Sequence, residues 1–128
     1  MPRTTESEKA VEAYLVKRMR EIRGKAYKWV SPGNNGVPDR ICLFPSGICE
    51  LVELKGKGGA LTPSQKKRFP ELVRLGRHVW VLWSRQEVDL FLAYMQGGDR
   101  DAISTTPVSG LLYQPPADLS LIHISEPT

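Results

Sequence analysis

Two carboxylates and one ammonium group occur in this sequence in an order that suits phosphodiester chemistry. Asp39 follows a proline, and the run Glu53-Leu54-Lys55 comes later in the chain. Side chains in a β-strand alternate between its faces, so Glu53 and Lys55 point the same way if their segment is extended. Asp39 begins one apolar run and Glu53 lies near the end of the next. In an antiparallel hairpin those two ends are neighbours, so the three charged groups are predicted to meet at one edge of a sheet.

This set of groups favours metal-assisted hydrolysis. Two nearby carboxylates repel each other unless a cation lies between them. Mg²⁺ (or Mn²⁺) prefers oxygen ligands and is usually held by one or two carboxylates with water and substrate phosphate. Asp39 and Glu53 are therefore the predicted metal ligands, and Lys55 is placed to orient or help activate the attacking water and to offset charge on the phosphorus. The competing interpretation is a solvated Glu–Lys pair on an edge strand, which is the commoner meaning of an isolated Glu-x-Lys.

A glycine-rich basic loop at residues 55–59 follows directly. Glycine lets the backbone approach a phosphate chain closely, which favours the catalytic interpretation over the solvated pair. Other basic side chains gather around the proposed site and could follow a phosphate backbone, although a solubilising surface is the alternative. Trp29, Trp80 and Trp83 could stack on bases, with core packing expected for Trp80. The candidate nucleic-acid ligands are Arg40, Lys57, Lys66, Lys67 and Ser31.

A mixed α/β sheet flanked by helices is needed to position these groups. Apolar residues recur at helical spacing in three segments, and four short runs have the character of strands. A Pro-Ser-Gly turn at residues 45–47 predicts an antiparallel hairpin. Pro70 is expected to kink or interrupt the second helix. The predicted order is α-β-β-β-α-β-α, with helices at residues 7–23, 62–75 and 84–95 and strands at residues 26–30, 39–44, 48–55 and 78–83.

Two polar residues near helix starts have both a structural and a functional interpretation. Glu8 falls within the apolar stripe of the first helix, where a carboxylate needs a reason, but it also stands three residues after Thr5, the spacing of a capping box. Glu12, one turn later, is the other acidic candidate. Gln65 stands three residues after Thr62 and fits a capping box in the same way. Spacing alone leaves both interpretations open for each residue.

The composition is that of a globular domain with a basic body. The 128 residues are 41% hydrophobic and 25% charged. No apolar run approaches the ~20 residues that span a bilayer, and the first residues lack the apolar core of a signal peptide. Residues 1–96 carry 17 basic and 10 acidic side chains, whereas residues 97–128 carry one and four. We expect an intracellular protein with one domain at residues 1–96 and a poorly ordered acidic tail at residues 97–128, in which residues 111–113 could dock.

Three motifs in this sequence resemble the VRR-NUC (virus-type replication-repair nuclease) family of the PD-(D/E)xK nuclease superfamily. They are Gly-Val-Pro-Asp-Arg at residues 36–40, Val-Glu-Leu-Lys at residues 52–55 and Leu-Thr-Pro-Ser-Gln at residues 61–65. The resemblance runs from about residue 6 to about residue 83. It implies a restriction-endonuclease-like core and divalent-metal-dependent cleavage of DNA, in some members of branched DNA.

The resemblance also implies roles for individual residues. Asp39 and Glu53 resemble the metal-binding carboxylates, Lys55 the catalytic lysine, Gln65 the glutamine supplied by the following helix and Glu8 the acid of the first helix. The backbone carbonyl of Leu54 is a further expected metal ligand. These expectations describe an Mg²⁺- or Mn²⁺-dependent DNA endonuclease in the cytoplasm of a bacterial or phage-infected cell, which could act as a homodimer. The alternatives are a catalytically inactive nucleic-acid-binding module and a scaffold whose hairpin is only a dimerisation edge.

Overall fold

The computed structural model describes residues 3–97 and 107–116 and has the element order predicted from the sequence. Predicted and observed boundaries differ by one or two residues. Beyond the predicted elements, one 3₁₀ helix follows the third α-helix. The elements are α1 (Glu8–Glu21), β1 (Lys25–Lys28), β2 (Arg40–Leu43), β3 (Cys49–Leu54), α2 (Pro63–Arg74), β4 (Val79–Leu82), α3 (Arg85–Gly97) and η2 (Pro107–Leu111).

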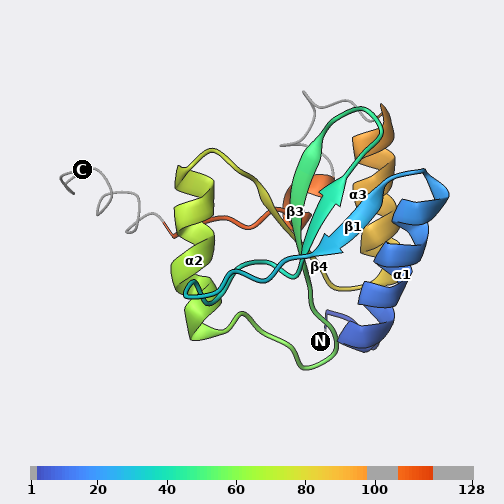
Figure 1. The fold of residues 1–128 in the computed structure, drawn as a ribbon. Coiled ribbons are helices and arrows are strands. Elements are labelled where there is room, and N and C mark those ends of the chain that lie inside the picture. Colours follow the sequence, from blue (N-terminus) through green and yellow to red (C-terminus); the bar gives the residue numbers. More distant parts are fainter. Residues whose placement is uncertain (1–2, 98–106, 117–128) are drawn as a thin grey trace.

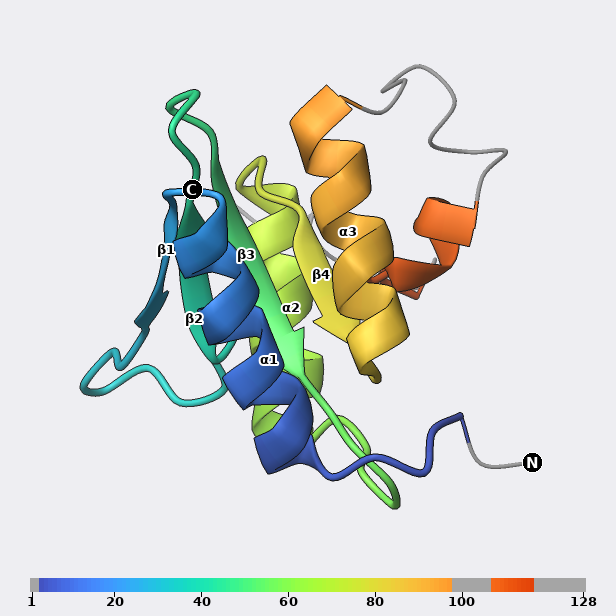
Figure 2. The ribbon, with the colours of Figure 1, turned by 90° about the vertical axis from the view of Figure 1, so that its right-hand side faces the viewer.

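A four-stranded mixed sheet in the order β1-β2-β3-β4 forms the centre of the fold. The first three strands are antiparallel, and β4 runs parallel to β3. The predicted hairpin is therefore confirmed, and its register pairs Arg40 with Val52. Helices α1 and α3 cover one face of the sheet, while α2 covers the other (Figure 1; Figure 2). This is the flanked mixed sheet that the sequence predicts.

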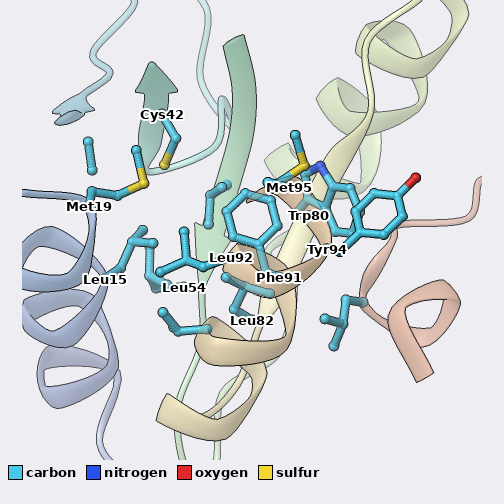
Figure 3. Close-up of a cluster of buried hydrophobic side chains, with 14 of the residues drawn as sticks. Leu15, Met19, Cys42, Leu54, Trp80, Leu82, Phe91, Leu92, Tyr94 and Met95 are labelled. Carbon is cyan, nitrogen blue, oxygen red and sulfur yellow. The ribbon is translucent and has the colours of Figure 1, made fainter. Parts of the chain in front are cut away.

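The larger core lies between the sheet and the pair α1 and α3. Apolar residues at helical spacing on α1, namely Val11, Leu15 and Met19, are fully buried there. Trp80 from β4 packs against Phe91 of α3 with ring centroids 5.0 Å apart. Figure 3 shows these side chains meeting between the layers. Trp80 is 1% exposed, so its expected core role is confirmed.

Helix α2 continues through Pro70, so of the two expected effects, a kink or an interruption, the interruption does not occur. Proline removes one backbone hydrogen-bond donor, but its ring and the neighbouring Phe69 are both buried against the second face of the sheet. The helix begins at Thr62, which caps it, and its last turn leads into Gly76 at φ +94°. Good caps and a buried apolar face therefore outweigh one missing hydrogen bond.

Part of the C-terminal segment packs on the domain. Val108 and Leu111 are buried, and Leu112 forms an antiparallel bridge with Trp80. The Tyr113 amide donates to the Val79 carbonyl at 2.8 Å, which extends the pairing along the free edge of β4. The docking expected for residues 111–113 is thus present. The rest of the predicted tail, residues 98–106 and 117–128, lies outside the described residues, so its separation from the domain stays a prediction.

Within residues 3–97 and 107–116, no helix is both long and apolar enough to cross a bilayer.

Candidate active site

The predicted acidic and basic pair lies at the carboxyl end of β3, on the face that α2 covers. Glu53 is 1% exposed and Lys55 is 5% exposed. The Lys55 Nζ atom lies 3.1 Å from Glu53 Oε2, so the two side chains form a buried ion pair. A solvated pair on an edge strand does not fit this burial, because β3 is flanked by β2 and β4 on both sides.

Asp39 immediately precedes β2 and lies opposite Glu53 across the hairpin. The Asp39 amide donates to Glu53 Oε1 at 3.0 Å, and the Leu54 amide donates to Asp39 Oδ2 at 3.1 Å. Each carboxylate is therefore held by the backbone of the opposite segment. The predicted meeting of Asp39, Glu53 and Lys55 is present in the structure, and its cause is the hairpin register.

Gln65 connects the first turn of α2 to this ion pair. Its amide nitrogen Nε2 donates to Glu53 Oε2 at 2.7 Å, and its Oε1 accepts from Lys55 Nζ at 3.0 Å. The same Oε1 accepts from the Thr62 amide at 3.0 Å, while the Gln65 amide donates to Thr62 Oγ1 at 3.1 Å. The capping box and the contact with the charged pair, which spacing left open as alternatives, therefore hold together.

Glu8 is the first residue of α1 and does not cap it, contrary to the predicted Thr5–Glu8 box. The cap is Ser7, whose side chain accepts from the Ala10 amide. Partial burial and the nearby Asp39 carboxylate raise the pKa of Glu8, and Lys55 lowers it. The Glu8 side chain is exposed in the first turn of α1, where a carboxylate is favourable at the helix N-terminus, and it lies within electrostatic reach of Asp39 and Lys55. The structural and the functional interpretations therefore both stay open.

Glu12 has a different position from Glu8, one turn further along α1. Its carboxylate accepts from Arg40 Nε at 3.0 Å. The Arg40 guanidinium also donates to the Ala26 carbonyl at 3.1 Å. Sequence analysis missed this pair because Arg40 and Glu12 lie far apart in sequence. The predicted nucleic-acid ligand Arg40 is therefore partly buried and already engaged by protein groups.

The other predicted nucleic-acid ligands lie at the surface around the site. Lys57 is exposed in the loop after β3, and Lys66 and Lys67 are exposed on the first turns of α2. Ser31 is half-buried in the loop after β1, where its hydroxyl accepts from the Asn34 side chain at 3.2 Å. Nothing in these contacts opposes binding to a phosphate chain, and their roles stay predictions.

Two glycines allow close backbone contacts that align the site. A Cβ atom on Gly56 would lie 2.1 Å from the Glu8 amide nitrogen, so the loop after β3 touches the start of α1. A Cβ atom on Gly36 would lie 2.3 Å from the Ser64 carbonyl oxygen and 2.9 Å from the Gln65 amide nitrogen. These glycines place Glu8 and Gln65 beside the hairpin, and sequence spacing gave no sign of either contact.

Gly36→Ala is expected to lower the free energy of unfolding more than Gly33→Ala. Both glycines have positive φ, +89° and +81°, so each alanine carries a strain of about 1–2 kcal/mol. Of these two glycines, only Gly36 has no space for a methyl group. Forcing α2 away from it adds about 1–3 kcal/mol to the loss in the free energy of unfolding. Denaturant unfolding of both variants measures the difference. Equal losses would show that the contact with Ser64 does not constrain α2.

Burial and like charge raise the proton affinity of the acidic groups in the site. Desolvation, followed by repulsion from Asp39, raises the pKa of Glu53 to about 7, against hydrogen bonds from Gln65 and Lys55 that lower it. Burial is also the main cause of the raised pKa of Asp39, opposed by the Leu54 amide. The pair therefore gains from any cation that neutralises both carboxylates.

The metal-free protein is expected to lose stability as pH rises from about 4.5 to about 7. In this range folded Glu53 keeps a proton that the unfolded chain has released, so the free energy of unfolding falls with pH. The full loss is on the order of 3 kcal/mol. Denaturant titrations in a chelator measure this slope, and Glu53→Gln should flatten it. An unchanged slope in that variant would assign the effect to another group.

The donor set at this site fits a hard divalent cation. Asp39 and Glu53 supply oxygen atoms, and Mg²⁺ typically takes one or two protein carboxylates and keeps water for its other positions. Within residues 3–97 and 107–116, no three or more His, Cys, Asp or Glu side chains form a group that could hold a metal ion. The two carboxylates, with water in the other positions, match the ligands that magnesium usually takes in proteins.

Comparison with known proteins agrees with the fold. No family model matches the chain. A protein of Acyrthosiphon pisum secondary endosymbiont phage 1 named "Putative nuclease p44" is 45% identical over 78 residues, which is 61% of this chain and 84% of that protein. A solved structure titled "VRR_NUC domain" superposes with a TM-score of 0.62 at 24% identity and covers 70% of this chain and 98% of its own. This likeness shows that the chain has the PD-(D/E)xK-type fold of a VRR_NUC domain. The identity to the phage relative and the share of it that is covered lead to one conclusion: the chain belongs to the same nuclease family as that phage protein.

Proposed function

We propose that this nuclease is a divalent-metal-dependent endonuclease that hydrolyses DNA phosphodiester bonds. The observation that carries the proposal is the buried Glu53–Lys55 pair, with Asp39 across the hairpin and Gln65 bridging both members. Burying an ammonium and a carboxylate costs free energy that an apolar core would not, which favours a functional reason for the pair. Hydrolysis at a phosphate uses each of these groups.

Each residue has a distinct part in the proposed reaction. Asp39, Glu53 and the Leu54 carbonyl would hold Mg²⁺ or Mn²⁺, with Glu8 assisting directly or through water. The bound ion would supply a water of lowered pKa and neutralise the phosphate. Lys55 orients the attacking water and offsets the charge that develops on the phosphate oxygens. Gln65 acts on Glu53 and Lys55 and fixes their relative positions.

The basic surface around the site would hold the DNA backbone. Lys57, Lys66 and Lys67 extend from two sides of the site and would bind phosphates in a salt-dependent way. Ser31 would add a hydroxyl contact, and Arg40 would act from its place beside Glu12. Branched DNA is the proposed substrate class, and a homodimer would engage two of its strands. The site of action would be the cytoplasm of a bacterial or phage-infected cell.

A substrate panel tests the proposed function. Single-stranded, duplex, flap and four-way DNA are incubated with the protein in Mg²⁺, in Mn²⁺ and in a chelator, and circular forms are included to detect internal cuts. We expect metal-dependent cleavage of circular and branched substrates. Cleavage that continues in the chelator would overturn the metal mechanism. Binding without cleavage in either metal would identify a catalytically inactive nucleic-acid-binding module.

A further inference from the structure

A cavity lies beside the proposed active site, at the carboxyl ends of the parallel strands β3 and β4. Its volume is about 310 Å³, at the lower end of the ~300–1,000 Å³ typical of ligand pockets. The carboxyl ends of parallel strands are where open α/β sheets commonly bind ligands. The cavity is lined by Arg3, Thr4, Trp83 and the loop at residues 56–59.

One wall of this cavity consists of two planar groups. The Arg3 guanidinium carbon lies 5.6 Å from the centre of the Trp83 ring, in a cation–π arrangement. Glu87 of α3 fixes both groups: it accepts from Arg3 Nε at 3.2 Å and Nη2 at 3.3 Å, and from the Trp83 amide at 2.9 Å. Arg3 also donates to the Gly110 carbonyl at 3.3 Å. This wall is held in place by α3 and the 3₁₀ helix, and it consists of an aromatic ring with a guanidinium over it.

The opposite wall is the glycine-rich loop that follows Lys55. The Lys57 amide donates to the Glu6 carbonyl at 2.7 Å, and the N-terminal segment runs beside this loop (Figure 2). The Lys57 side chain is exposed and free of any ion pair within the described ranges. A Cβ atom on Gly59 would lie 3.6 Å from Lys55 Cδ, so the loop folds back over the buried lysine. The loop therefore forms a wall of the cavity and also contacts the proposed catalytic residue Lys55.

We propose that this cavity accepts one unpaired DNA nucleotide next to the scissile phosphate, an inference that rests on the proposed function. The base stacks on the flat Trp83–Arg3 wall, and the adjoining phosphate lies against Lys57 and the glycine backbone. A base within a duplex is stacked and paired on both sides and does not reach the wall. The cavity thus selects DNA that has a single-stranded position beside the cut, as at a flap or branch.

The proposal is tested by scanning a flap substrate with abasic sites, one unpaired position at a time. Affinities are measured with Glu53→Gln protein, which binds without cutting, in combination with Trp83→Leu, Trp83→Phe or Tyr27→Leu. Tyr27 is the matched control, since it is an exposed aromatic under a cation, Lys25, on the edge strand β1. Lys57→Ala is compared separately because an exposed lysine can be removed without disturbing the fold.

We expect one abasic position to weaken binding by about 5-fold to 150-fold, the range produced by loss of a stacked base. Trp83→Leu should weaken the binding of intact DNA by a similar factor, and in this variant removing the base at that position should cause no further loss of affinity. In Trp83→Phe and Tyr27→Leu, removing that base should still weaken binding. Lys57→Ala should reduce the salt dependence of binding by about one phosphate contact. Thermal unfolding of each variant verifies its fold.

Two results would overturn the nucleotide pocket without affecting the proposed function. One is an equal affinity of the protein for all flap substrates, wherever the abasic site lies. The other is a loss of affinity at one abasic position that is still seen in folded Trp83→Leu. Both are read from binding, whereas the proposed function is read from cleavage by the unmodified protein. If the protein cleaves DNA but binds all abasic substrates equally, the pocket alone is refuted. If binding depends on the abasic position but no cleavage occurs, the proposed function alone is refuted.

Discussion

Glu53→Gln is expected to reduce DNA cleavage by about 10³-fold or more while leaving the protein folded. Glutamine has nearly the same shape, but it carries no charge to attract a divalent cation or to balance Lys55. Loss of a single group that stabilises transition-state charge commonly costs about 10²–10³ in rate, and loss of a metal ligand adds to that. Single-turnover cleavage in Mg²⁺ measures the effect.

Glu50→Gln is the matched control for this substitution. Glu50 lies three residues before Glu53 on the same strand, and its side chain points to the other face of the sheet, where its Oε1 accepts from the Trp80 indole nitrogen at 2.7 Å. A glutamine oxygen can accept the same hydrogen bond, so the rate should stay at the level of the unmodified protein. Comparable rates for Glu53→Gln and Glu50→Gln would refute the assignment of Glu53.

Lys55→Met is expected to lower the cleavage rate at saturating DNA by about 10²–10⁴-fold, the range for a positioned acid–base group. Methionine fills much of the same buried space but cannot donate to Gln65 or pair with Glu53. The binding constant for DNA should change little, because the lysine is 5% exposed and most phosphate contacts are assigned to the exposed lysines around it. Separate measurements of rate and affinity test this division.

Lys17→Met provides the control for removing a positive charge. Lys17 is exposed on α1, and we assign it no part in binding or reaction. Its replacement should affect neither the saturating rate nor the fold. A Lys55→Met protein that cleaves normally but binds DNA weakly would show that Lys55 is a binding residue and not a catalytic one.

The chemistry of the site could be predicted from sequence because it depends on local pattern and one hairpin. Alternation along β3 places Glu53 and Lys55 on one face, and the short turn between β2 and β3 brings Asp39 opposite Glu53. Both effects follow from backbone geometry within a few residues. The element order could be predicted for the same reason, since apolar periodicity distinguishes helices from strands locally.

The role of Gln65 shows where local pattern becomes insufficient. Its spacing from Thr62 predicts the capping box, which forms. The same spacing contains no information about the face of the sheet on which α2 packs. That packing is what brings the amide of Gln65 to Glu53 and Lys55.

By itself, the sequence determined the order of elements, the hairpin and the meeting of Asp39, Glu53 and Lys55. Only the tertiary structure decided that Arg40 pairs with Glu12 and that the helix starts are positioned by contacts at glycine. The physical reason is the distance along the chain over which each kind of interaction acts. Hydrogen bonding and side-chain alternation act between residues close in sequence, whereas contacts between layers depend on how whole helices pack against the sheet.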